Sequence, residues 1–461
     1  MEQTRENPLG REKIGALLAR FAVPSIIALL VSALYNIVDQ FFIGWSVGML
    51  GNAATNVAFP LTITCTGLSL LCGIGGAANF NLCMGRKETE RAERFAGAAI
   101  GMMLILGMVL CIGTRLFLRP LMLAFGATAD SLDYALAYTG ITSFGFPFLI
   151  LTTAGSNLIR ADGSPRFSML CTLSGAAINT ILDPVFIFRF GMGMAGAALA
   201  TVLGQLVSGL LVAGYLLHFK TVHLRLRSLL PSAEYCRQIL ALGSAPFFNQ
   251  MAMMAVQIVM NNTLRHYGAM SSYGDAIPLA CAGIITKVNM IYFSIVIGIS
   301  QGIQPVISFN YGAKDYARVR ETYKKAAVLV VCISVAAFLC FQLVPRRIIG
   351  LFGEGSEEYY RFAEEYFRIF LFFTFANGIQ PITANFFTSI GKAGRGVFIS
   401  LTRQILFLLP LILILPLFLG IDGVMYAAPV ADFIAAVLAV LFVTREFARM
   451  KKEGEALDGT E

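Results

Sequence analysis

A carboxylate and an amide stand four residues apart inside one long apolar stretch of the chain. The stretch runs from Phe167 to Phe188 and, at about 1.5 Å per helical residue, is long enough to cross a bilayer. Asn179 and Asp183 would share one face of such a helix. Pro184 lacks an N–H, so the carbonyl oxygen four residues before it stays free beside the carboxylate. Such oxygens suit a proton or a hard cation, and the alternative is an Asp that hydrogen-bonds between helices for packing.

A second acid ends a polar stripe in the first apolar run. Ser32, Asn36 and Asp39 recur at spacings of four and three residues, which places them on one helical face. A helix that faces lipid would not carry this stripe, so it should face a protein interior or a wet cavity. Because Asp39 lies near the outer end of its run, an interfacial Asp that reaches water is the competing interpretation.

The composition defines the class of protein. Of 461 residues 57% are hydrophobic and 13% are charged, whereas soluble proteins carry about 25% charge. The apolar runs are continuous and do not alternate, so the spans are helices and not barrel strands. We expect an all-α integral membrane protein with twelve spans at about 18–43, 53–83, 95–116, 132–158, 167–188, 194–218, 238–264, 278–308, 326–344, 362–388, 397–417 and 424–443.

Two patterns repeat at nearly one offset. The pattern G-x-K-[ED]-x-x-R begins at Gly85 and again at Gly312, and a Gly-rich pattern begins at Gly193 and again at Gly423. A duplication into two six-helix, pseudo-symmetric lobes accounts for both, and an even number of spans per lobe makes the repeats parallel. The predicted units are an amino-terminal lobe (1–219), a cytoplasmic linker (220–237) and a carboxy-terminal lobe with a cytoplasmic tail (238–461).

The basic residues indicate the orientation. With twelve spans both termini lie on one side, and most Lys and Arg fall on that side, Arg160, Arg395 and Arg403 among them. The positive-inside rule therefore predicts a multi-pass protein of the plasma (inner) membrane with both termini in the cytoplasm. The net charge of +8 follows from this distribution and does not indicate a nucleic-acid partner.

The direction of each span predicts how deep the polar residues of the first half lie in the membrane. The fifth span runs outward, which puts Asp183 about 24 Å above its cytoplasmic end, and the sixth runs inward, which puts Thr201 about 10 Å below its outer end. Asp39, Asn179, Asp183 and Thr201 then lie in the outer half of one lobe.

The second half differs. Asn261 stands where the repeat places Asp39, so this half has no acid in its first span. Lys287 is either a buried partner of an acid or a side chain that extends to the interface. Arg403 is expected near a cytoplasmic end, reaching the headgroups. Asn36, Gln250 and Asp432 are candidates to line a substrate cavity, with packing or capping as the alternative for Asp432.

The nine Cys contain no CxxC pair and mostly lie in apolar runs, and the three His lie at span ends or in loops. This pattern indicates neither a disulfide framework nor a metal site. We expect no cofactor and no metal beyond Na⁺ at Asp39 and Asp183.

The chain resembles the multidrug and toxic compound extrusion (MATE) transporters. The resemblance is carried by Asn36–Asp39 followed by Phe41–Gly44, by Asn179–Pro184, and by Gln304–Ala313, which is similar to the family's signature at the end of the eighth helix. It implies two lobes around a V-shaped cavity that exchange a cytoplasmic organic cation for entering H⁺ or Na⁺. It also implies that the ion site of the amino-terminal lobe falls on Asp39, Asn179, Asp183 and Thr201.

The predicted function is secondary antiport: export of organic cations or drugs in exchange for H⁺ or Na⁺. The expected partners are a cationic, amphipathic small-molecule substrate and the lipid bilayer. Protonation of Asp39 or Asp183, or Na⁺ between them, would remove negative charge and reshape the helix near Pro184, which weakens the hold on a cation. A flippase for lipid-linked precursors is the alternative within the same superfamily. It would require a cationic cavity for a pyrophosphate, whereas the buried charges of the amino-terminal lobe are acidic. A membrane-embedded enzyme lacks a nucleophile or metal cluster at membrane depth, and a passive channel fits duplicated lobes poorly.

Overall fold

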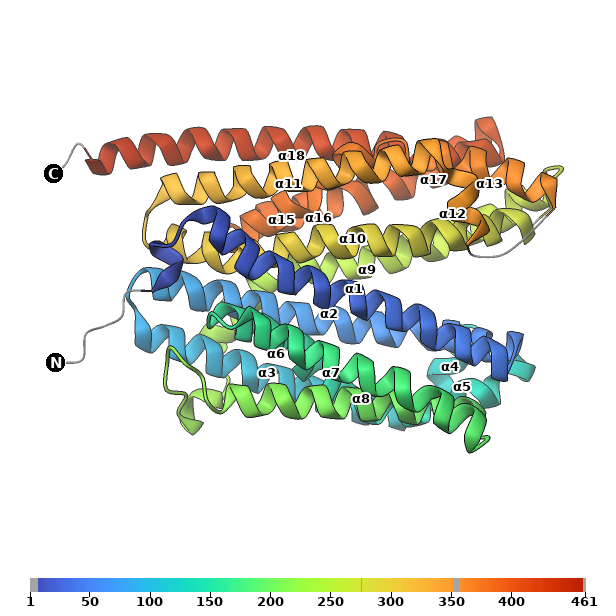
Figure 1. Ribbon diagram of the computed structural model, residues 1–461, viewed down its shortest axis with the longest axis horizontal. Coiled ribbons are helices and arrows are strands. Elements are labelled where there is room, and N and C mark those ends of the chain that lie inside the picture. The colour runs from blue at the N-terminus through green and yellow to red at the C-terminus, as the bar shows by residue number, and fades with distance from the viewer. Residues whose placement is uncertain (1–6, 275, 352–355, 459–461) are drawn as a thin grey trace.

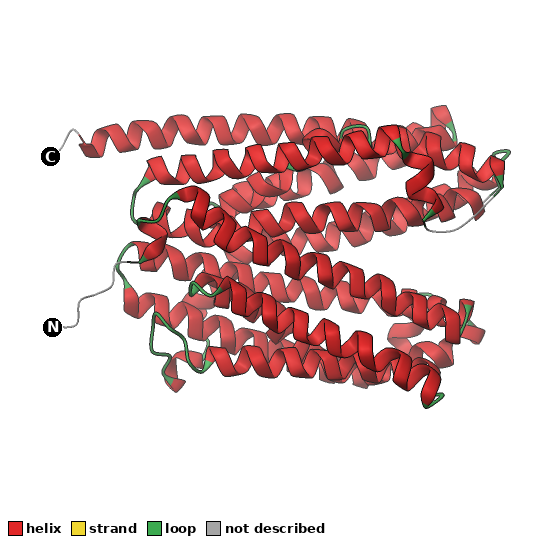
Figure 2. Ribbon diagram, viewed as in Figure 1, coloured by secondary structure: helices red, strands yellow, loops and turns green. Residues whose placement is uncertain are grey.

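The computed structural model describes residues 7–274, 276–351 and 356–458. Within these residues every regular element is a helix (Figure 2). A short 3-10 helix, η1, precedes the first long helix, and the first lobe follows it (Figure 1). Its elements are η1 (Pro8–Gly10), α1 (Ile14–Ser46), α2 (Met49–Gly85), α3 (Thr89–Leu116), α4 (Leu118–Ala124), α5 (Ala129–Thr142), η2 (Ser143–Gly145), α6 (Phe146–Ala161), α7 (Pro165–Pro184), the π-helix η3 (Val185–Arg189) and α8 (Gly193–Leu216).

The second lobe follows a connector that contains the 3-10 helix η4 (Leu226–Leu229). The two lobes lie side by side, and the start of α1 and the end of α18 lie at the same end of the bundle, called here the terminal end (Figure 1). The elements of the second lobe are α9 (Ala233–Ala269), α10 (Ala276–Gly312), α11 (Tyr316–Leu343), α12 (Pro345–Gly350), α13 (Glu357–Phe370), α14 (Thr374–Asn377), α15 (Ile379–Ser389), α16 (Ala393–Leu401), the π-helix η5 (Thr402–Leu408), α17 (Leu409–Leu419) and α18 (Ile421–Asp458).

Eleven of the described helical stretches are long and apolar enough to cross a membrane. The expected tenth span, 362–388, is different, because α13, α14 and α15 divide it. Pro381 lies in the first turn of α15 and has no N–H to extend a helix from the preceding residues, so the helix restarts there. With this broken crossing the chain has the twelve predicted spans in two lobes.

The two lobes meet mainly along two helix pairs, α1 with α10 and α2 with α9, and α10 also packs on α2 and α6. Glycine permits both crossings. A Cβ atom on Gly243 of α9 would collide with the backbone of Leu71 on α2, and one on Gly302 of α10 would collide with the backbone of Ala22 on α1. Small residues of this kind let helices approach closely where lipid supplies no hydrophobic drive for association. We call this contact the seam.

The hydrophobic core also divides in two. One cluster of buried apolar side chains belongs to α2, α3, α5, α6 and α8, and a second belongs to α9, α10, α11, α13, α15 and α18, together with the first turns of α1. Leu9, Leu17 and Phe21 lie in the second cluster although they precede or begin α1. The start of the chain is therefore packed on the second lobe.

Candidate ion-coupling site in the first lobe

The four predicted ion-coupling residues come together in the first lobe. Asp39 lies on α1, Asn179 and Asp183 lie on α7, and Thr201 lies on α8. Asp183 is fully buried and Asp39 is 9% exposed. The packing of α7 between α1 and α8 brings the four side chains into one cluster.

The Asn179 amide connects two of the helices. Its nitrogen donates to Asp183 Oδ2 at 3.3 Å, and its oxygen accepts from the backbone N and the Oγ1 of Thr201, each at 3.3 Å. The spacing of four residues thus places Asn179 and Asp183 on the same face of α7, as the sequence predicts. One amide fixes the carboxyl group on its own helix and attaches that helix to α8.

The carboxyl groups of Asp39 and Asp183 lie in hydrogen-bonding contact with each other. Asp39 Oδ1 is buried and has no hydrogen-bond partner among the described residues. Two buried carboxyl groups in contact repel each other when both are ionised, and a shared proton or a bound cation removes that repulsion. Carboxylate, amide and hydroxyl oxygens are the ligands that a hard monovalent cation or a proton requires, so these residues fit either ion.

Two tyrosines complete the cluster, and the sequence analysis missed both. The Tyr138 hydroxyl on α5 lies near Thr201, and Tyr35 on α1 lies near Ser32, Asn36 and Asp39. Tyr35 precedes Asp39 by four residues, so the polar stripe itself could have identified it. No local pattern marks Tyr138, because it reaches the site through tertiary packing.

The backbone beside Asp183 departs from the regular α-helix. Helix α7 ends at Pro184, and the π-helix η3 continues from Val185 to Arg189. Proline removes one hydrogen bond of the ladder, and π-turns of this kind recur at functional sites. The carboxyl group therefore lies next to a segment whose backbone pairing differs from that of the rest of α7.

The second lobe holds an ion pair where the first holds two acids. Asp432 on α18 is bound by the Arg403 guanidinium and accepts a hydrogen bond from Asn377 Nδ2 at 3.2 Å. Both charged side chains are buried. The prediction that Arg403 reaches the headgroups is wrong, because the residue lies ten positions into its span, on η5, where it faces α18. Since Asp432 is paired, it does not line an open surface.

The other cavity candidates are more exposed. Asn36 is exposed and donates to the Ser32 carbonyl oxygen at 2.7 Å. Gln250 and Lys287 are half-buried and have no hydrogen bond or ion pair to any described residue. Lys287 is eleven residues from Gly298, which packs on Ile26 of α1, so the helical repeat places both on the same face of α10.

These features define a helical transporter with two pseudo-symmetric lobes and a buried acid pair in the first. The MatE family model matches residues 24–185 and 245–414, one match in each lobe. Similar proteins include the multidrug export protein MepA of Staphylococcus aureus, 25% identical over 429 residues, and that of Staphylococcus haemolyticus, 26% identical over 435 residues. Each match covers 92% of both chains.

Solved structures have the same fold. One, described as an outward-facing conformation of a multidrug resistance MATE family transporter of the MOP superfamily, superposes with a TM-score of 0.90 at 23% identity. A MATE protein in a straight conformation superposes with a TM-score of 0.90 at 22% identity. Both alignments cover 98% of this chain and all of the solved chain. The chain belongs to the MATE family, and it is a transporter and not an enzyme.

Proposed function

We propose that this transporter exports organic cations in exchange for H⁺ or Na⁺, with the Asp39–Asp183 pair as the coupling site. The observation that supports this proposal is the contact between two buried carboxyl groups within an oxygen-rich cluster. Such a pair gains or loses a single positive charge readily, because one charge removes the mutual repulsion. The similarity to multidrug export proteins supports drug-like substrates.

The direction of transport follows from the proposed orientation. If the terminal end faces the cytoplasm across the inner membrane, the acid pair lies in the outward half of its lobe. An ion that enters from outside then reaches Asp39 and Asp183 before the lobes rearrange. Neutralising the pair weakens the attraction between the lobe and a cationic substrate at the outer face, where the substrate must leave.

The test is export of a fluorescent organic cation from vesicles in which a pH gradient and a Na⁺ gradient are imposed separately. Asp183→Asn removes the ionisable group with little change in shape, and we expect at least tenfold slower gradient-driven export. Asp133→Asn is the matched control, because it makes the same chemical change at an exposed position of α5. The gradient that drives wild-type export identifies the ion. Normal coupled export by the Asp183 variant would contradict the proposal.

A further inference from the structure

Arg160 is a buried cation on the seam between the lobes. It lies in the last turn of α6 and is 5% exposed, although the sequence groups it with the basic residues of the terminal side. Its guanidinium donates to Asn157 Oδ1 at 2.6 Å and to Ser168 Oγ at 3.4 Å within its own lobe. It also donates to Gln301 Oε1 of α10, in the other lobe, at 2.9 Å.

All three acceptors of Arg160 are neutral. No carboxylate in the described ranges lies within ion-pair distance of this guanidinium. Burial of a charge costs free energy, and an acid is the partner that offsets this cost best. The chain uses that solution elsewhere, since Arg403 has Asp432. At Arg160 the partner in the second lobe is instead the carboxamide of Gln301, which has the shape of a Glu side chain without its charge.

Two further amide side chains form hydrogen bonds across the seam, and both bond a neutral backbone carbonyl. Gln304 Nε2 donates to the Ile74 carbonyl oxygen at 3.0 Å, and Asn79 Nδ2 donates to the Gln238 carbonyl oxygen at 3.2 Å. Gln304 lies one helical turn beyond Gln301 on α10 and faces α2, where no described basic side chain bonds it. It therefore serves as an internal comparison for Gln301.

We propose that Arg160 and Gln301 form a reversible latch that holds the terminal end of the seam closed. Hydrogen bonds from a guanidinium to neutral acceptors close the seam, while the absence of an acid lets the latch open when the guanidinium is rehydrated. An acid at position 301 would make a buried ion pair across the lobes and keep the seam closed. The fixed positive charge also opposes the passage of cations through the closed seam.

The test changes position 301 and measures the seam directly. Spin labels at exposed Glu90 on α3 and Lys324 on α11, in a background with the nine cysteines replaced, report the distance between the terminal ends of the lobes by electron–electron resonance. For Gln301→Glu we expect the ratio of short-distance to long-distance populations to rise at least tenfold. In the double variant Arg160→Gln with Gln301→Glu, we expect that rise to disappear.

Gln304→Glu is the matched control. It adds the same acid one turn away, where no guanidinium faces it, so the seam should open and not close. The latch is overturned if Gln301→Glu leaves the ratio within twofold of wild type, or if the rise persists without Arg160. The distance measurement needs no substrate, so it stands apart from the proposed function. If the proposed function also holds, Gln301→Glu should slow export at least tenfold, and this export measurement is the part of the test that rests on the proposed function.

Discussion

Lys87 and Lys314 stand at the same point of the two lobes and share a left-handed backbone conformation, with φ of 63° and 62°. Each follows a long helix, and each turn is closed by the same hydrogen bonds. Lys87 N donates to the carbonyl of Met84, as Lys314 N does to that of Tyr311, and the next residue in each turn donates to the carbonyl five residues before it. The repeat that the sequence contains is thus also a repeat of helix-ending geometry.

Replacing either lysine by glycine should preserve or raise stability. Left-handed backbone costs an L residue about 1 kcal/mol, which glycine avoids, although glycine makes the unfolded chain more flexible. We expect thermal unfolding in detergent to show a gain of up to about 0.5 kcal/mol for Lys87→Gly and Lys314→Gly. Lys324→Gly, at an exposed position inside α11, should instead lose about 1 kcal/mol. Equal losses at all three positions would contradict the strain argument.

The sequence predicted the spans well because continuous apolar runs of membrane length are rare outside membrane helices. It also predicted the acid cluster, because helix direction alone decides which half of the membrane each polar residue reaches. It could not predict the partner of Arg403. In a helix that is apolar on most sides, the sequence does not indicate which face meets a neighbour, and the π-turn of η5 changes the helical register there. Tyr138 was missed for a related reason, since only tertiary packing brings it to Thr201.

The hydroxyl of Thr201 should influence the affinity for the coupling ion. It is hydrogen-bonded to the Asn179 amide and lies near the Tyr138 hydroxyl, so its loss leaves the amide without one partner. We expect Thr201→Val to raise the ion concentration for half-maximal export about fivefold, which corresponds to a hydrogen bond worth about 1 kcal/mol. Thr201→Ser keeps the hydroxyl and should remain within about twofold of wild type. If the serine and valine variants behaved alike, the hydroxyl would have no such role.

The buried pair of Arg403 and Asp432 should behave as one unit. Arg403→Met alone leaves an uncompensated carboxylate and should cost about 3–5 kcal/mol of stability, as should Asp432→Leu alone. The double variant removes both charges and should cost clearly less than the sum. Thermal unfolding of the three variants measures this coupling. Additive losses would show that the two charges do not stabilise each other.

The segment before α1 should depend on one arginine of the other lobe. Arg318 on α11 donates to the Leu9 carbonyl at 3.1 Å and to the Glu12 carbonyl at 2.7 Å, while Asn310 also binds the Leu9 carbonyl. We expect Arg318→Ala to speed hydrogen exchange in residues 7–13 at least tenfold, because these carbonyls lose their charged donor. Arg320→Ala is the control, since among the described residues the Arg320 side chain bonds only the Tyr316 carbonyl of its own helix. Unchanged exchange in the Arg318 variant would mean that burial of Leu9 and the Asn310 hydrogen bond hold the segment without Arg318.

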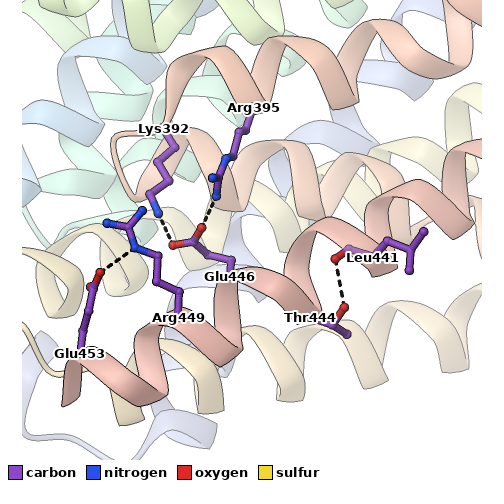
Figure 3. Close-up of polar contacts among 7 residues, drawn as sticks. All are labelled: Lys392, Arg395, Leu441, Thr444, Glu446, Arg449 and Glu453. Atoms are coloured by element: carbon purple, nitrogen blue, oxygen red, sulfur yellow. Dashed lines mark hydrogen bonds and ion pairs between the residues drawn. The ribbon is translucent and has the colours of Figure 1, made fainter. Parts of the chain in front are cut away.

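Glu446 joins α18 to the loop between α15 and α16 and to the first turn of α16. The carboxylate is 1% exposed and binds both Lys392 and Arg395, whereas Glu453, two turns further along α18, pairs with Arg449 at an exposed position (Figure 3). We expect Glu446→Gln to cost about 2 kcal/mol, because Lys392 and Arg395 both lose the counter-charge of this buried carboxylate.

Glu453→Gln should cost less than about 0.5 kcal/mol, because an exposed pair gains little from its charge. The melting temperatures of the two variants in the same detergent, together with their salt dependence, test this difference. Added salt should reduce the small effect at position 453 and leave most of the effect at position 446, because buried charges are screened weakly. Equal losses for both variants would mean that burial does not strengthen the Glu446 contacts. The large loss is expected only where the carboxylate is removed from solvent and joins two separate elements.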